Sequence, residues 1–406
     1  MGGIVAGVAI RTVQPWFSAQ GLSRMTAMRR QRVGGGPPVR SRPRRQFSVA
    51  SRLLIGCTVL VSACGKAATD APPVAAAASF TEVDLPSFQL VGRVLPGSDS
   101  VFTGGPIAVL GSNVLVAEGK GPAPLAVLDR QTGRFVERVA SFGAGPGEFG
   151  GISSMNASGS NDVLLYDFGS RRAYTLNTNQ LQSPSGMWEQ VHLVGGGAPL
   201  KPVLADGDSI VSNGLYADGR LAVYAPDGSL ARHAGELPPG DEEVPGSIRN
   251  HAWQSFLYAH PQGSAFVLVN RHADMVEIYN RDLTPTKRVS GPLGFLPAFD
   301  IVAVDGAPVF VQDPDIRFGY TGVTATSDHI FALYSGRSML EAPGRAFLGS
   351  SVIVFDWGGT PIAKLNFEGD ALSIAVSESG EEVFLLFQSP APVVVRYEVP
   401  DFGMLQ

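Results

Sequence analysis

The sequence predicts an all-β protein, and three observations lead to this prediction. The chain holds 49 Gly and 30 Pro in 406 residues, about a fifth of the sequence against about 12% in average proteins, so long helices are not expected. At 44% hydrophobic and 17% charged residues, it is apolar enough to bury a large core. Short apolar runs alternate with turn residues through most of the chain, which indicates many short strands joined by tight turns.

Two kinds of predicted strand recur six times each. The first kind follows a turn and begins at Val114, Val163, Ile210, Phe266, Ile330 and Val383. The second kind ends in an apolar residue before a turn, at Leu128, Leu176, Tyr224, Tyr279, Phe355 and Tyr397. The second follows the first by 13 or 14 residues in five units and by 25 in the fifth. A hairpin of fixed length, repeated in each unit, accounts for this constancy.

A period near 50 residues with about four short strands per unit is typical of propeller blades. We therefore expect a six-bladed β-propeller with four-stranded antiparallel blades over residues 86–406. The sixth unit lacks room for a fourth strand after Tyr397, and residues 88–95 can supply it, so that an N-terminal strand closes the ring. A seventh blade is the structural alternative, because residues 279–355 are long for one unit; two full blades would need more, so one enlarged blade is expected.

Two segments also carry a family resemblance. Residues 141–149, SFGAGPGEF, resemble the Gly-Pro-Gly-x-Phe linker of NHL repeats, and Asp167 followed five residues later by Arg172 and an apolar strand matches the pattern of that family. The whole body is similar to the six-bladed, TolB-like propeller domains of bacterial lipoproteins, including residues 328–336. The resemblance implies a fold rather than an activity. For Asp167 and Arg172 we expect a structural ion pair that braces a hairpin.

The first 63 residues predict an export signal. They hold ten Arg and no acidic residue, and residues 53–63 are an apolar run that is too short to span a bilayer but fits a signal peptide. The small residues before Cys64 resemble a bacterial lipobox, which implies acylation of the Cys64 thiol and anchoring in a membrane. Arg44 and Arg45 match a twin-arginine signal in part, so both export routes stay open, as does a true start at Met25 or Met28.

The expected organisation is a signal region at 1–63, the lipidated Cys64 with an Ala/Pro tether at 64–85, and the propeller at 86–406. Because Gly65 stands where many inner-membrane lipoproteins carry Asp, outer-membrane anchoring in the cell envelope is favoured. The formal net charge is −5, and without the ten Arg of the leader the body is acidic, which argues against nucleic acid as a partner. The expected partners are the membrane, through Cys64, and an envelope protein or glycan.

No catalytic constellation stands out. An axial metal site needs oxygen ligands on the inner strands, but the expected inner strands offer one Asn and no carboxylate. The six His residues lack the spacing of a zinc helix, and no Gly-x-Ser-x-Gly elbow occurs. We therefore expect no catalytic residues, no metal and no cofactor, and a binding or scaffold function. A propeller hydrolase or lyase with a metal site at the axial channel is the alternative.

The repeat is interrupted by surplus residues at about 240–253, 291–320 and 337–351. In a four-stranded blade, the connections after the second and fourth strands emerge on one face, so all three insertions can share a rim. They mix Arg with aromatic residues, as binding surfaces do. The candidate partner-binding residues are Arg249, Trp253, Arg317, Tyr320, Arg337 and Arg345. The alternative is that these are solvated, variable loops without a function.

Overall fold

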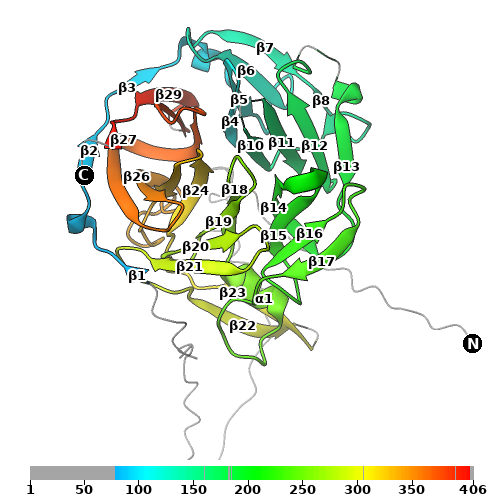
Figure 1. Cartoon of the computed structure of the whole chain (residues 1–406), viewed down its shortest axis with the longest axis vertical. Coiled ribbons are helices and arrows are strands. Elements are labelled where there is room, and N and C mark those ends of the chain that lie inside the picture. Colours follow the sequence, from blue (N-terminus) through cyan, green and yellow to red (C-terminus); the bar gives the residue numbers. More distant parts are fainter. Residues whose placement is uncertain are drawn as a thin grey trace, which may run out of the picture. The chain divides into compact units, whose positions relative to one another are not determined.

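The computed structural model describes residues 78–402 except 160, 182, 184, 305 and 389. The predicted signal region and Cys64 lie outside the described residues. The described part is a six-bladed β-propeller of four-stranded antiparallel blades, as the repeat predicted (Figure 1). In this part of the chain, no helix has the length and apolar character needed to span a membrane.

The first four blades follow the chain without interruption, each running from its inner to its outer strand. Blade 1 consists of β4 (Ile107–Leu110), β5 (Asn113–Ala117), β6 (Leu125–Asp129) and β7 (Phe135–Val139). Blade 2 consists of β10 (Ser154–Ser158), β11 (Asp162–Asp167), β12 (Arg172–Asn177) and β13 (Glu189–His192). Blade 3 consists of β14 (Ala198–Leu204), β15 (Ile210–Leu215), β16 (Leu221–Tyr224) and β17 (Leu230–Ala234). Blade 4 consists of β18 (Ser255–Ala259), β19 (Ala265–Asn270), β20 (Met275–Asn280) and β21 (Pro285–Ser290).

Blades 5 and 6 share one long strand. Blade 5 consists of β24 (Tyr320–Ala325), β25 (His329–Tyr334), β26 (Gly349–Asp356) and the first part of β27 (Pro361–Val376). The last part of β27 is the inner strand of blade 6, where it pairs with β28 (Glu382–Phe387), which pairs with β29 (Val393–Glu398). The two blades therefore form one continuous hydrogen-bonded sheet.

The inner strands enclose the propeller axis. β4, β10, β14, β18, β24 and the last part of β27 contact one another in this order, and β27 contacts β4 again. The central strands of the blades are buried on both sides; for example, Val114, Leu115 and Val116 of β5 are fully buried. The core therefore consists of layers of apolar side chains between neighbouring blades.

The N-terminal segment covers the outer edges of three blades in turn. β1 (Ala78–Ser79) pairs with β21 of blade 4, and β2 (Ser87–Gln89) pairs in parallel with β27 in blade 5. β3 (Gly92–Val94) then pairs antiparallel with β29 and completes blade 6, which confirms the closure predicted from the sequence. Only part of the predicted strand makes this pairing. Leu90 is buried, whereas Val94 is 56% exposed.

The hairpin turns are those that the sequence predicted. The predicted turns at 129–133, 226–228 and 357–359 each end in a glycine with a positive φ. The φ values are 70° at Gly133, 82° at Gly228 and 82° at Gly359. This left-handed backbone strains residues that carry a Cβ atom. Tight two-strand connections are possible at these places because glycine occupies them.

The remaining elements lie in the connections. Four 3₁₀ turns and two short strands occur at η1 (Glu82–Asp84), η2 (Pro96–Ser100), η3 (Ser185–Met187), η4 (Asp206–Asp208), β8 (Ser141–Phe142) and β9 (Glu148–Phe149). The helix α1 (Gly246–Ala252) lies between blades 3 and 4, and a hairpin of β22 (Phe299–Val304) and β23 (Ala307–Gln312) lies between blades 4 and 5. The surplus residues thus form separate elements beside an enlarged blade 5.

The expected ion pair between Asp167 and Arg172 is not formed. The two residues are register partners on β11 and β12, but the Asp167 carboxylate accepts hydrogen bonds from the backbone N–H groups of Gly150, Gly169 and Ser170 at 2.7, 2.8 and 3.2 Å. The Arg172 guanidinium donates instead to the carbonyl oxygens of the Gly-rich linker. The buried Asp167 carboxylate therefore holds the turn through neutral backbone N–H donors and not through the charge of Arg172.

Candidate functional site

A small cavity lies between the inner strands of the propeller. Inner-strand residues from five blades meet around a cavity of about 10 Å³, which is at the lower limit for one water molecule. The residues around it are mostly of apolar type and include Ile107, Met155, Tyr258, Val323 and Ile374. Among the described residues there is also no group of three or more His, Cys, Asp or Glu side chains that could hold a metal ion. This region offers no donor set for the axial metal site of the enzyme alternative.

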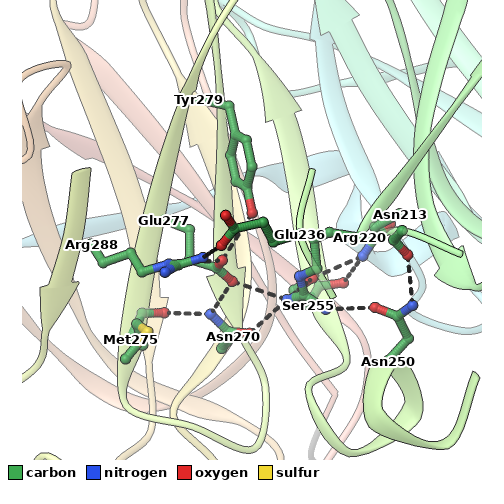
Figure 2. Close-up of polar contacts among 11 residues, drawn as sticks. Asn213, Arg220, Glu236, Asn250, Ser255, Asn270, Met275, Glu277, Tyr279 and Arg288 are labelled. Atoms are coloured by element: carbon green, nitrogen blue, oxygen red, sulfur yellow. Dashed lines mark hydrogen bonds and ion pairs between the residues drawn. The ribbon is translucent and has the colours of Figure 1, made fainter. Parts of the chain in front are cut away.

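A buried polar network joins blades 3 and 4 (Figure 2). The Arg220 guanidinium, 2% exposed, lies 3.1 Å from the Glu277 carboxylate. It also donates hydrogen bonds to Asn270 Oδ1 at 2.8 Å, to Ser255 Oγ at 3.2 Å and to Asn250 Oδ1 at 3.4 Å. Arg220 directly precedes β16, and its partners come from α1, β18, β19 and β20. One side chain thus connects elements that are far apart in sequence.

Glu277 is the negative centre of this network. Burial raises the pKa of its carboxyl, but the charge of Arg220, a hydrogen bond from Asn270 and the charge of Arg288 outweigh burial and hold the pKa below its usual range. Tyr279 donates a further hydrogen bond to Glu277 Oε2 at 2.9 Å. Glu277 is therefore ionised at neutral pH and fully engaged.

Two asparagines extend the network to the backbone. Asn250 in α1 donates to the carbonyl oxygens of Tyr216 and Gly219, both at 2.8 Å. Asn213 on β15 donates to the carbonyl oxygen of Ser255 at 2.7 Å. These bonds fix the start of β18 and the end of α1 against blade 3. The neighbours of the network residues in the chain, His251, Gln254 and Arg271, are positioned as a consequence.

Two cationic side chains lie next to this network. The Lys201 ammonium on β14 donates to the carbonyl oxygen of Ser153 at 2.7 Å and lies 5.5 Å from the ring centre of Phe256. Arg271, directly after β19, donates to Gln254 Oε1 at 3.3 Å. Its guanidinium lies 5.3 Å from the ring centre of Phe318.

The place of these residues in the fold is the mouth of the channel. Ser153, Gln254 and Phe318 each stand just before the first residue of an inner strand or two residues ahead of it. In an antiparallel blade, the second and fourth strands end on the face where the inner strand begins. The helix α1 and the β22–β23 hairpin follow the fourth strands of blades 3 and 4, and residues 335–348 follow the second strand of blade 5. The three insertions therefore share the face at which the inner strands begin, as the blade pattern predicted.

The charges at this mouth are mutually repulsive. Burial and the nearby Arg271 lower the pKa of Lys201 to about 8, and burial lowers that of Arg271 to about 10. Burial and Arg271 also lower the pKa values of His251 and His272, the latter well below its usual range. We call Lys201, His251, Arg271 and His272 the basic cluster. Within the described ranges, no carboxylate lies within 4.0 Å of Lys201 or Arg271.

The sequence interpretation did not identify this cluster. Lys201 stands in a segment that it assigned to an inner strand, and a lysine in such a strand is the one signal that could have pointed to the site. A metal site requires carboxylates or other oxygen ligands on the inner strands, and a cation such as Lys201 does not fit that pattern. Arg271 lies in a tight connection, and nothing in its local sequence distinguishes it from a solvated residue.

Two of the predicted partner-binding residues are buried rather than exposed. Trp253 is 5% exposed and packs with Ala273, Phe299 and Phe310, while Tyr320 is fully buried. The structure therefore places Trp253 in the core rather than on an exposed loop. The β22–β23 hairpin covers the indole, and this hairpin has no counterpart in the other blades.

The four predicted arginines all have hydrogen-bond or ion-pair partners. Arg249 donates to the carbonyl oxygen of Pro238 at 3.3 Å, and Arg317 forms a two-pronged pair with Glu341 at 2.7 and 2.6 Å. Arg337 and Arg345 both pair with Asp370 in the middle of β27, at 2.7 and 3.0 Å. The Arg345 side chain remains 67% exposed. Arg317, Arg337 and Arg345 thus brace the enlarged connections of blade 5.

The fold and the repeat agree with the comparison with known families. A family model described as TolB-like 6-blade propeller-like matches residues 130–379. The chain belongs to this family of TolB-like six-bladed propellers. No curated protein matches the chain.

Three solved structures are similar to the chain at low identity. One is a Bacteroides fragilis protein that is described as an exported protein. It is 13% identical to this chain, with a TM-score of 0.48, and the match covers 78% of this chain and 99% of that one. A member of the DUF4221 family from Bacteroides vulgatus is 9% identical with a TM-score of 0.46, over 77% and 97%. A protein described as the calcium-binding protein regucalcin from Agrobacterium tumefaciens is 11% identical with a TM-score of 0.43, over 77% and 95%.

Proposed function

We propose that this protein is an exported, lipid-anchored propeller that acts as a binding or scaffold module at the cell envelope. One observation carries the proposal: three insertions enlarge the face at which the inner strands begin, while the inner strands of five blades enclose a cavity of only about 10 Å³. The molecule therefore offers an extended surface for contacts rather than an interior for chemistry.

The insertions supply apolar contact area. Of the sixteen large apolar side chains that are exposed in the described part, eight lie in two of the three insertions: Leu293, Leu296, Ile301, Val302, Val304, Val309, Val311 and Leu340. Val302 and Val309 are register partners on β22 and β23. Contiguous exposed apolar side chains mark interaction surfaces in soluble proteins. Arg345, in the third insertion, is the most accessible of the proposed arginine contacts and suits an envelope protein or glycan.

The membrane attachment rests on the sequence of the leader. The apolar run at 53–63 ends directly before Cys64, and acylation of this thiol would hold the propeller at a membrane. One acyl chain binds marginally, whereas two or more anchor stably, at about 0.8 kcal/mol per buried CH₂. A Cys64→Ser variant should leave the membrane fraction and should not incorporate labelled fatty acid; retention with labelling would contradict the anchor.

The binding surface is tested by capture from the native envelope. Val302→Ser with Val309→Ser removes an exposed apolar pair, so capture of the partner should be lost while the thermal midpoint stays nearly unchanged. The matched control is Met187→Ser, which alters an apolar side chain that is 75% exposed outside the insertions. Equal capture by the double variant and the control would remove the insertions from the proposal.

A further inference from the structure

Several buried or partly buried arginines of the propeller have a carboxylate partner, whereas in the described part of the chain Lys201 and Arg271 of the basic cluster do not. Arg220 and Arg288 share Glu277, Arg317 has Glu341, and Arg337 has Asp370. Lys201 and Arg271 are likewise partly buried, yet within the described ranges they face carbonyl oxygens, an amide oxygen and aromatic rings. The described carboxylates thus leave these two cations uncompensated.

Such an arrangement costs folding free energy. Taking a charge out of water is unfavourable unless an opposite charge accompanies it, and two like charges nearby add repulsion. Arg172 and Arg249 also donate to carbonyl oxygens and have no carboxylate within 4.0 Å in the described part, but Lys201 and Arg271 in addition repel each other. The cluster is retained at the mouth of the channel, on the face that the insertions enlarge.

We propose that Lys201 and Arg271 form a binding site for an oxyanion, the carboxylate or phosphate group of a small soluble ligand. This proposal rests on the proposed function, because it takes the same face of the propeller as the binding face and names a ligand for it. The guanidinium offers a planar pair of donors and the ammonium a compact charge, a combination that matches either group. The partly exposed ring of Phe256 supplies apolar surface for the remainder of the ligand.

The site is built on rigid elements. Lys201 lies within an inner strand, and Arg271 follows Asn270, which is hydrogen-bonded to the buried Arg220 and Glu277 (Figure 2). The backbone N–H of Arg271 donates to the carbonyl oxygen of Gln254 at 2.7 Å. Preorganised donors of this kind bind without a loss of loop entropy.

A role in binding and a role in the fold predict opposite effects on stability. Removing an uncompensated buried charge relieves a cost, so Lys201→Met should raise the thermal midpoint or leave it unchanged. Removing a charge that holds the fold should lower it. The pH dependence of stability also separates these two roles, because the pKa of Lys201 in the folded protein lies below the unfolded value of 10.5. Stability should then rise with pH from about 8 toward 10.5 in the parent but not in Lys201→Met.

The experiment is titration calorimetry of the intact protein with inorganic phosphate and, separately, with succinate, at constant ionic strength in sodium chloride. Binding of one probe alone assigns the ligand class, and binding of both supports a general oxyanion site. Lys201→Met and Arg271→Gln should each weaken binding roughly tenfold or more, as expected for the loss of a charged hydrogen bond. Lys201→Arg should retain binding, and the exposed Lys287→Met, the same substitution on β21, should bind like the parent.

Three results would overturn the site: no binding of either probe, equal binding by the parent and both cluster variants, or a lowered thermal midpoint in Lys201→Met. These results are separate from a failure of the proposed function. Capture of an envelope partner by the apolar hairpin can persist when the oxyanion site is absent, and phosphate can bind to a protein that captures no partner.

Discussion

Arg220 and Glu277 stand 57 positions apart in the sequence and meet at 3.1 Å between two blades, with side chains that are 2% and 7% exposed. No backbone hydrogen bond joins blades 3 and 4 within the described sheets. The pair and its amide partners therefore supply buried directional contacts at this boundary, between an apolar core and the exposed ion pair of Arg281 with Asp206. Directional contacts specify how the two blades align, since apolar packing alone tolerates small displacements.

Loss of this pair should destabilise the propeller. Arg220→Met leaves the Glu277 carboxylate buried beside Arg288 alone, and removal of one partner of a buried pair costs about 3–5 kcal/mol. Denaturant unfolding should show this loss. The control is Arg281→Met, because Arg281 pairs with Asp206 on the surface with side chains that are 68% and 44% exposed. Equal midpoints for the two variants would show that the network contributes nothing to stability.

The same carboxylate predicts a response to acid. The pKa of Glu277 in the folded protein lies below 4.5, its ordinary value. Its contribution to stability is therefore complete above pH 4.5 and is lost as the pH falls through the folded-state pKa. We expect Glu277→Gln to be less stable than the parent at pH 7 and to lose less stability between pH 5 and pH 3. Thermal melts across this range measure both quantities, and parallel curves would refute the assignment.

Trp253 should behave as a core residue. Trp253→Ala removes an indole packed against Ala273, Phe299 and Phe310, and such truncations cost about 3–5 kcal/mol. Arg345→Ala, in contrast, should change the midpoint very little because the side chain is mostly exposed. If Trp253→Ala melts like the parent, the hairpin does not cover the indole in solution.

The N-terminal segment should protect the outer edges. A chain that starts at Leu95 lacks β1, β2 and β3, so the edges of β21, β27 and β29 lose their partners. Unpaired edges pair with other chains, and we expect aggregation on heating. Light scattering compares this chain with one that starts at Ala78, which keeps all three strands. A monomeric shorter chain with an unchanged midpoint would contradict the closure.

The sequence allowed the fold to be predicted because each blade repeats one local pattern. Constant hairpin lengths and glycine turns are properties of neighbouring residues, and Tyr397 marked the missing strand. The environment of Trp253 is different, since it depends on a hairpin that departs from the repeat and folds back over α1. The basic cluster was equally out of reach. Lys201 and Arg271 come from neighbouring blades, and only the packing of blade 3 against blade 4 brings their charges together.

The shared strand β27 has a consequence for how the molecule opens. Blades 1 to 4 meet their neighbours through side chains and isolated backbone hydrogen bonds, such as that from Val194 to Gly228, so each can loosen along its boundary. Blades 5 and 6, in contrast, are one sheet through Pro361–Val376. Amide protons in β25, β26, β28 and β29 should consequently exchange with solvent in a single cooperative event, at the rate of the largest opening. The amide protons of the two C-terminal blades would then be the last in the ring to exchange. Refolding of the remaining blades would start from these two blades.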